Sequence, residues 1–193
     1  MRSIQSDHGK VTGIRYVGGT VLTTGSDGAV RIWHWENNDM LVLTNAFQAH
    51  DGVISALDVW GHHLATTGCD DRVRVWHWVS RALVAEVCGI LFIFSLKKQK
   101  QIRFSQFAHS HYAYGVHLDK TRLLTSSHDG FVVMRNWRTR ETLFALRLAD
   151  DTVDDCILSH GKVYAVRSSG RVVAISSEVR RPPVRVSPLS ALF

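Results

Sequence analysis

Cysteine and proline are both scarce in this chain of 193 residues, which contains three of each. The cysteines Cys69, Cys88 and Cys156 are odd in number and form no Cys-x-x-Cys pair, so they do not indicate a disulfide framework. This usage favours a reducing compartment, and we expect the protein in the cytoplasm or the nucleus. All three prolines lie after residue 181, so the rest of the chain has none to interrupt a β-strand.

Long hydrophobic runs are missing as well. No window approaches the roughly 18 apolar residues that a membrane span needs, and the most apolar run, residues 88–96, is far shorter. The first ten residues are polar from the start, so we expect no secretory signal. The sequence therefore predicts no membrane span.

The net charge of +6 is unevenly distributed. Residues 88–104 carry four basic side chains and no acidic one, and residues 176–193 carry three basic side chains against one glutamate. Since these two segments account for the whole excess, the remainder is neutral, and the charge gives only weak support for nucleic-acid binding.

Motifs for common cofactors are also absent from the sequence. There is no P-loop and no G-x-G-x-x-G, so no nucleotide cofactor is expected. The histidine pairs at residues 62–63 and 109–111 lack the cysteine or carboxylate partners that would complete a zinc ligand set. We expect neither a metal nor another cofactor.

What the sequence does contain is a repeat. A histidine (His8, His50 or His109) is followed 15 or 16 residues later by a threonine (Thr23, Thr66 or Thr125), and four residues after that by an aspartate (Asp27, Asp70 or Asp129). A tryptophan stands eight residues beyond each aspartate, at positions 35, 78 and 137. A period near 42 residues built from short apolar runs indicates a repeat architecture.

Each copy is predicted to be β-structure throughout. Short runs rich in β-branched and aromatic residues alternate with Gly- or Asp-containing turns, and four such runs fill one period. Four antiparallel strands per period are typical of a blade in a β-propeller. From residue 150 a faded fourth copy keeps the spacing but has Ala165, Ser169 and Ile175 in the threonine, aspartate and tryptophan places.

We divide the chain into a repeat array at residues 1–176 and a basic, proline-containing tail at 177–193, where residues 184–187 are an alternative edge strand. The blades are predicted at about 8–49, 50–87, 105–149 and 150–176. Residues 88–104 are an insert with three interpretations: a basic, apolar docking loop, a long connection between blades, or translated intron sequence.

The order His, Thr, Asp, Trp resembles that of the WD40 repeat family. The matching residues are His8, Thr23, Asp27 and Trp33 in the first copy, His50, Thr66, Asp70 and Trp76 in the second, and His109, Thr125 and Asp129 in the third. The resemblance departs from the family pattern where Trp33 and Trp76 are followed by histidine, and where Arg135 replaces the third tryptophan.

The resemblance implies that these tetrads are structural. The aspartate would fix the histidine, the histidine would donate to the threonine hydroxyl, and the threonine would bond the tryptophan indole, at about 0.5–1.5 kcal/mol for each neutral link. A catalytic triad built from the same residues is disfavoured, because the set recurs in every copy without a nucleophile elbow.

Two features are candidates for partner binding. A buried, unpaired Arg135 would be costly, so we expect its side chain to reach solvent or to pair with an acid such as Asp129. Asp150 and Asp151, with Asp154 and Asp155, are expected in a loop and turn that enter the first strand of the fourth copy, where a basic partner segment could dock.

The sequence thus predicts an all-β array of about four WD40-type propeller blades, in an incomplete or open propeller. Its expected function is a non-catalytic scaffold that binds other proteins or peptides through its loops. Two alternatives are a substrate receptor of a ubiquitin ligase, since the compact copies are similar to those of F-box WD40 proteins, and an RNA- or chromatin-associated protein.

The number of predicted blades does not determine whether the propeller closes into a ring. WD40 propellers usually have seven blades, and four blades are too few for such a ring. Three arrangements are left open: the four blades close into a small ring alone, two chains form an eight-bladed ring, or the chain is part of a longer protein. An open array would expose sheet edges and an apolar face through which chains could self-associate.

Overall fold

The computed structural model describes residues 9–36, 40–88, 91–95, 100–104, 109, 111–139, 141–148 and 152–176. Every regular element in these ranges is a β-strand, and the strands form four antiparallel sheets. Within the same ranges, no helix is long and apolar enough to span a membrane.

The first sheet, blade 1, has the strand order β1-β2-β3-β4. Its strands are β1 (Val11–Val17), β2 (Thr20–Gly25), β3 (Ala29–Glu36) and β4 (Met40–Gln48). Each pairs with the next in the chain, so the sheet is a simple meander.

Blade 2 is larger because the insert adds a hairpin to it. Its first four strands are β5 (Ile54–Trp60), β6 (His63–Gly68), β7 (Arg72–His77) and β8 (Ala82–Cys88). The strands β9 (Leu91–Ser95) and β10 (Lys100–Phe104) extend the same sheet beyond β8. The described parts of residues 88–104 are therefore paired strands, since β9 forms a ladder with β8 and β10 forms one with β9.

Blades 3 and 4 continue the meander with four strands and three strands. Those of blade 3 are β11 (Ala113–Leu118), β12 (Arg122–Ser127), β13 (Phe131–Asn136) and β14 (Thr142–Arg147). Those of blade 4 are β15 (Val153–Ser159), β16 (Lys162–Arg167) and β17 (Val172–Ser176). The alternative edge strand at residues 184–187 lies outside the described residues.

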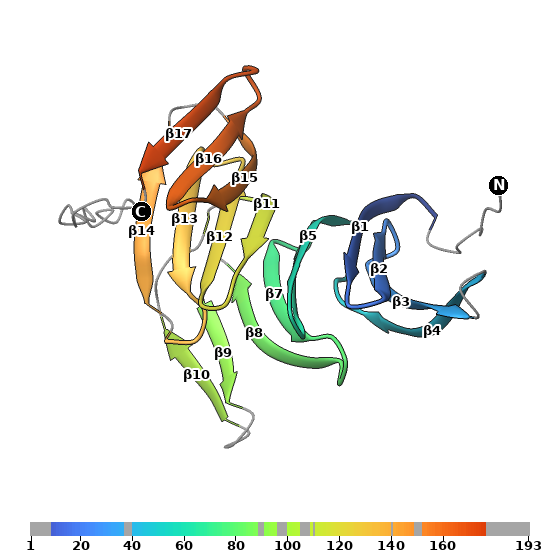
Figure 1. The fold of residues 1–193 in the computed structure, drawn as a ribbon. Helices are drawn as coiled ribbons and strands as arrows, with labels where there is room; N and C mark the ends of the chain where they lie inside the picture. The colour runs from blue at the N-terminus through green and yellow to red at the C-terminus, as the bar shows by residue number, and fades with distance from the viewer. Residues whose placement is uncertain are drawn as a thin grey trace.

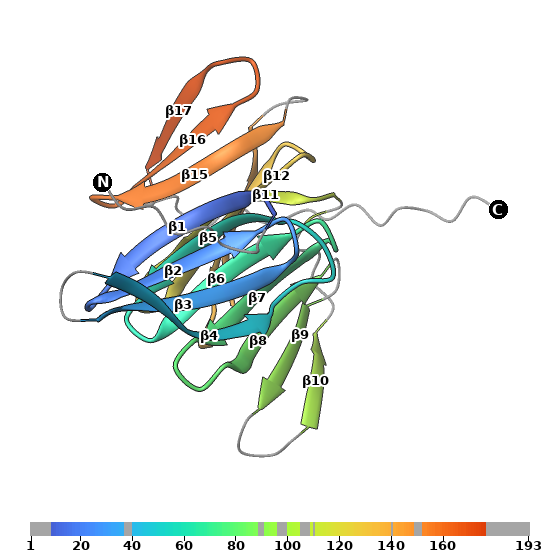
Figure 2. The ribbon, with the colours of Figure 1, turned by 90° about the vertical axis from the view of Figure 1, so that its right-hand side faces the viewer.

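The four sheets follow one another along an arc, with blade 1 and blade 4 at its two ends (Figure 1). The first strand of each blade is innermost, and β1, β5, β11 and β15 are neighbours in that order. Figure 2, seen from the side, shows β5 beside β1 and the outer strands fanning away from them. The fold is an all-β, incomplete propeller whose described sheets do not close into a ring, which confirms the predicted fold class.

The turn that precedes the third strand requires a left-handed backbone. Gly28 and Gly130 have φ of 78° and 77° there, and Asp71 takes the same place in blade 2 with φ of 61°. Aspartate tolerates this conformation better than most residues but at a cost that glycine avoids. A Cβ on Gly28 would lie only 2.1 Å from the His50 carbonyl oxygen, so blade 1 also needs glycine for space.

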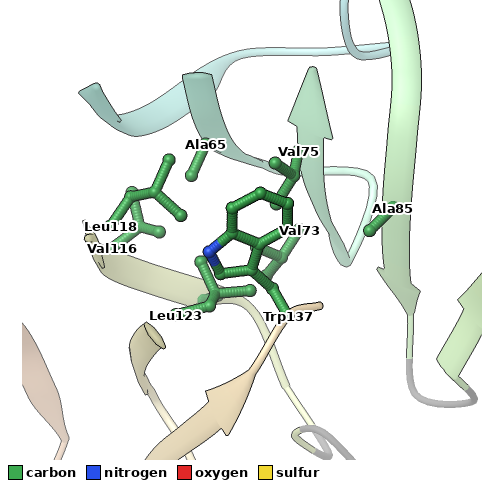
Figure 3. Close-up of a cluster of buried hydrophobic side chains, with 9 residues drawn as sticks. Ala65, Val73, Val75, Ala85, Val116, Leu118, Leu123 and Trp137 are labelled. Carbon is green, nitrogen blue, oxygen red and sulfur yellow. The ribbon is translucent and has the colours of Figure 1, made fainter. Parts of the chain in front are cut away.

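Each blade has two faces, which we define by their neighbours. The front faces the preceding blade and carries the tryptophans, and the back faces the following blade and carries alternate residues of the same strands. Figure 3 shows one such contact, in which Trp137 on the front of blade 3 inserts among Val73 and Val75 on the back of blade 2. Trp76 and Trp78 pack in the same way against the back of blade 1.

Candidate functional site

The tetrad of blade 2 is assembled from the first loop and two strands of that blade. His50 Nδ1 lies 2.7 Å from Asp70 Oδ1, and His50 Nε2 lies 2.8 Å from Thr66 Oγ1. The Trp76 indole N–H donates to the same hydroxyl oxygen at 3.1 Å. The structure thus brings all four residues into one chain of hydrogen bonds, with His50 and Thr66 buried.

The direction of these hydrogen bonds follows from the charge states. Burial lowers the pKa of His50, outweighing the hydrogen bond to Asp70 that raises it. Burial alone would raise the pKa of Asp70, but the hydrogen bond from His50 lowers it overall, so Asp70 is ionised at neutral pH. The ionised Asp70 carboxylate can only accept a hydrogen bond, so it favours the tautomer with the proton on His50 Nδ1. Arg74 Nη1 also lies 2.9 Å from this nitrogen.

His50 Nε2 is therefore an acceptor, and the Thr66 hydroxyl donates to it while accepting from the Trp76 indole. In this tautomer the hydrogen bond runs from the Thr66 hydroxyl to His50, the reverse of the direction expected from the sequence. A chain of donors that runs from the indole to the carboxylate uses every polar atom for internal bonding, which is what a structural network requires.

The other copies differ from blade 2 in the residues that the structure describes. In blade 1 the Trp33 indole donates to Thr23 Oγ1 at 2.8 Å, Asp27 pairs with Arg31 at 2.7 Å, and His8 lies outside the described residues. In blade 4 the place of Asp150 is also outside them, as is Asp151. Ala165 there is fully buried and packs in an apolar cluster with Ile175 at its edge, so apolar contacts occupy the place of the network.

Blade 3 retains the hydrogen bonds of its histidine but has no tryptophan in the tetrad place. His109 Nε2 lies 2.8 Å from Thr125 Oγ1, and Nδ1 lies 3.2 Å from Asp129 Oδ1. Arg135 occupies the tryptophan place and is only 4% exposed, so the expectation that it reaches solvent is wrong. Burial lowers the pKa of Arg135, and at this depth the side chain offers almost no surface to a partner.

One buried ionic group was missed by the sequence analysis. Arg74 contacts Asp70 at 2.6 Å and Glu86 at 2.9 Å, and it donates to the Ala49 carbonyl at 2.8 Å. The spacing offered a signal, because Arg31 and Arg74 both stand four residues after the tetrad aspartate. Glu86 could not be identified without the strand register that places it opposite Arg74.

A second polar chain joins three blades near the centre of the arc. Asp58 of β5 accepts from Arg15 Nε of β1 at 3.2 Å and lies 3.1 Å from His117 Nδ1 of β11. Asp58 also accepts from the Leu118 backbone N–H at 2.8 Å. Although burial raises the pKa of Asp58, the hydrogen bonds from His117 and Leu118 bring it below its usual value.

A cavity of about 240 Å³ lies between the innermost strands of the four blades. Its lining includes Arg15, Ser55, Tyr114, Asp154 and Asp155. Asp154 and Asp155 are exposed, but they belong to β15 and not to the loop in which the sequence placed them. They lie between the buried Val153 and Cys156, where the ladder with β16 has a register shift. Exposed aromatic and acidic groups therefore meet at this cavity.

The described side chains provide little for catalysis or metal binding. Among them, no group of three or more histidine, cysteine, aspartate or glutamate residues is placed to hold a metal ion. Burial raises the pKa of Cys156 to about 12, so its thiol stays protonated and is a poor nucleophile. The histidines and threonines of the tetrads are already engaged in hydrogen bonds within their blades.

Comparison with known families identifies the repeat. The WD40 family, described as "WD domain, G-beta repeat", matches residues 2–34 and 41–77, a stretch that runs through blade 1 and ends with β7 of blade 2. No curated protein matches the chain significantly.

Solved structures share the fold at low sequence identity. The designed Ika4 protein superposes with a TM-score of 0.70 at 15% identity, over 90% of this chain and 95% of that one. The designed Ika8 protein has a TM-score of 0.60 at 13% identity, over 89% and 59% of the two chains. A chain in the crystal structure of the Mitotic Checkpoint Complex has a TM-score of 0.69 at 16% identity, over 91% and 51%. The chain thus spans little more than half of the last two.

Proposed function

We propose that this chain, which belongs to the WD40 repeat family through its first two blades, is a non-catalytic scaffold that binds other proteins. WD40 repeats generally mediate protein–protein interaction. The tetrads support this role because their polar atoms are used to hold each blade together. What remains for function is the rigid surface that the blades present.

The observation that carries the proposal is the cavity between the innermost strands. Four blades contribute to it, so a segment bound there would contact the whole array at once. Tyr114 offers an exposed ring, and the ring of His128 lies 6.2 Å from it. Asp154 and Asp155 add negative charge. Aromatic rings beside carboxylates suit a peptide segment with lysine or arginine side chains, through cation–π contact and charge pairing.

The experiment is a peptide array with sequences that differ in lysine and arginine content, followed by titration of the best binders against the purified chain. The Asp154→Asn/Asp155→Asn variant should weaken binding of basic peptides about tenfold or more, as expected when two charge contacts are lost. Asp51→Asn is the matched control, because Asp51 is an exposed acid that is not part of the cavity lining. Equal binding by all three proteins would contradict the docking of basic segments at this cavity.

The two alternatives from the sequence stay predictions. A ubiquitin-ligase receptor would need a further module, and no observation on the blades favours it. RNA or chromatin association would use the basic segments at 97–103 and 177–193, of which residues 97–99 and 177–193 lie outside the described residues. A pull-down whose yield falls with salt and disappears when residues 97–103 are neutralised would favour it over the protein scaffold.

A further inference from the structure

The front of blade 1 has no preceding blade to cover it, and it exposes apolar side chains. Three of these side chains are Ile14, Tyr16 and Trp35. Ile14 pairs with Thr23, and Tyr16 pairs with Val21, which in turn pairs with Trp33. Trp35 follows Trp33 by two residues in β3 and so lies on the same face. The exposed fractions of Ile14, Tyr16 and Trp35 are 61%, 67% and 51%. Leu43 of β4, which pairs with Trp33, adds a fourth exposed apolar side chain to the same face.

The equivalent residues of the next two blades are buried. Ile14 corresponds to Leu57 and Val116, which are 2% and 5% exposed, since each pairs with the tetrad threonine. Trp35 corresponds to Trp78 and Trp137, each 8% exposed. In both cases the burial comes from the back of the preceding blade. The front of blade 1 therefore has the composition of a blade–blade contact without the covering blade.

The back of blade 4 is the complementary surface. Val172 is 68% exposed, whereas its equivalents Val30, Val73 and Val132 are at most 3% exposed because the following blade covers them. Ile157 and Val166 lie on the same back and are also exposed. This chain thus carries one uncovered front and one uncovered back.

These two surfaces do not cover each other within one chain, since blades 1 and 4 lie at opposite ends of the arc (Figure 1). In the contacts that do exist, front always meets back: Trp78 packs in one cluster with Val30, and Trp137 packs in another with Val73. By the same rule, Trp35 of one copy would meet Val172 of another.

We propose that two copies of this chain assemble head to tail into one eight-bladed ring, in which the front of blade 1 of each copy packs on the back of blade 4 of the other. A front-to-back contact is heterologous, and it closes only when rotation brings the last back to the first front. Two equal contacts form, and no apolar face stays in water.

The test begins with the molar mass of the purified chain, measured by light scattering during size-exclusion chromatography over a range of concentrations. The wild type should elute as a single species of about twice 21.7 kDa. Trp35→Glu on the front and Val172→Glu on the back should each lower the affinity about a hundredfold or more, as for a central interface residue, and give monomers. Val79→Glu is the matched control, because Val79 is 54% exposed in a turn and should leave the dimer intact.

Mixing the two variants separates head-to-tail packing from other arrangements. A Trp35→Glu chain keeps its back and a Val172→Glu chain keeps its front, so an equimolar mixture should regain dimers through one intact contact. Circular dichroism of each variant shows whether it is folded, and the wild-type mass tests the proposal even if a variant is not. A monodisperse wild-type monomer, filaments that lengthen with concentration, or a mixture that stays monomeric while both variants are folded would each overturn the eight-bladed ring.

Discussion

The blade 2 tetrad predicts a specific loss of stability when Thr66 is replaced by valine. The two side chains have nearly the same shape, so the change removes the hydroxyl with little effect on packing. That hydroxyl accepts from the Trp76 indole at 3.1 Å and donates to His50 Nε2 at 2.8 Å. Two hydrogen bonds are lost, and two buried polar atoms lose their partners, so we expect the free energy of unfolding to fall by about 2–4 kcal/mol.

Thr125→Val in blade 3 is the internal control for this substitution. Thr125 is also buried and also bonds its histidine, at 2.8 Å, but the third copy has Arg135 where an indole would stand. One strong hydrogen bond is lost there, so the expected decrease is about 1–2 kcal/mol.

The assay is urea unfolding followed by circular dichroism, with the midpoint and slope compared among the wild type and both variants. Equal slopes are required before the midpoints are converted to free energies. A Thr66→Val loss below about 0.5 kcal/mol, or one no larger than that of Thr125→Val, would refute the assignment of the hydroxyl as a two-way bridge.

Three further predictions concern charge and burial. The pKa of His50 is lower in the folded state, so as the pH falls the unfolded chain binds the proton first. The contribution of His50 to the free energy of unfolding is therefore present above pH 6.5 and is lost below it, by at most about 1.4 kcal/mol per pH unit. Urea unfolding at several pH values should show that the free energy of unfolding depends less on pH in His50→Gln than in the wild type. Arg74→Ala should cost about 3–5 kcal/mol because it leaves two carboxylates facing each other in a buried place. Arg31→Ala should cost about 1 kcal/mol or less, because its partner Asp27 is 32% exposed and stays hydrated without the arginine. Equal losses would contradict the importance of burial of the carboxylates. Arg135→Trp should raise the free energy of unfolding by about 1 kcal/mol, since an indole donates to the threonine in both preceding blades; a decrease in the melting temperature would show that the site cannot accept the ring.

The strands could be predicted because their pattern is local. Residues that alternate between apolar and polar, bounded by Asp- and Gly-containing turns, specify a strand within six or seven residues, and the repeat shows the same answer three times. The tetrad residues were found for the same reason. Their spacing of 15 or 16 residues and then four residues recurs, and the recurrence singles them out from the other histidines.

Features that depend on long-range pairing could not be predicted in this way. Glu86 meets Arg74 only because β7 and β8 pair in one particular register. The composition of the insert at 88–104 left three interpretations open, and none of them included the pairing by which its described backbone continues the sheet of blade 2. Asp154 and Asp155 look like loop residues by charge alone, but the strand places them on an edge where carboxylates stay hydrated.

The position of Arg135 and the direction of the tetrad hydrogen bonds were missed because both depend on burial. A period of two assigns a side chain to a face but does not say how deeply the neighbouring blade covers that face. Likewise, the proton position on His50 follows from its desolvation and from the ionised Asp70, neither of which can be read from spacing.

The inner position of blade 2 has a consequence for how the array comes apart. Within the described residues, blade 2 combines all four residues of its tetrad with a buried ionic group, and it is covered on both sides. In a quasi-linear array, each unit is stabilised by its own bonds and by its immediate neighbours, so the terminal units fray first. Amide hydrogens of β6 and β7 should therefore exchange last, and the growing chain should gain its first durable nucleus only after residue 88 has been synthesised.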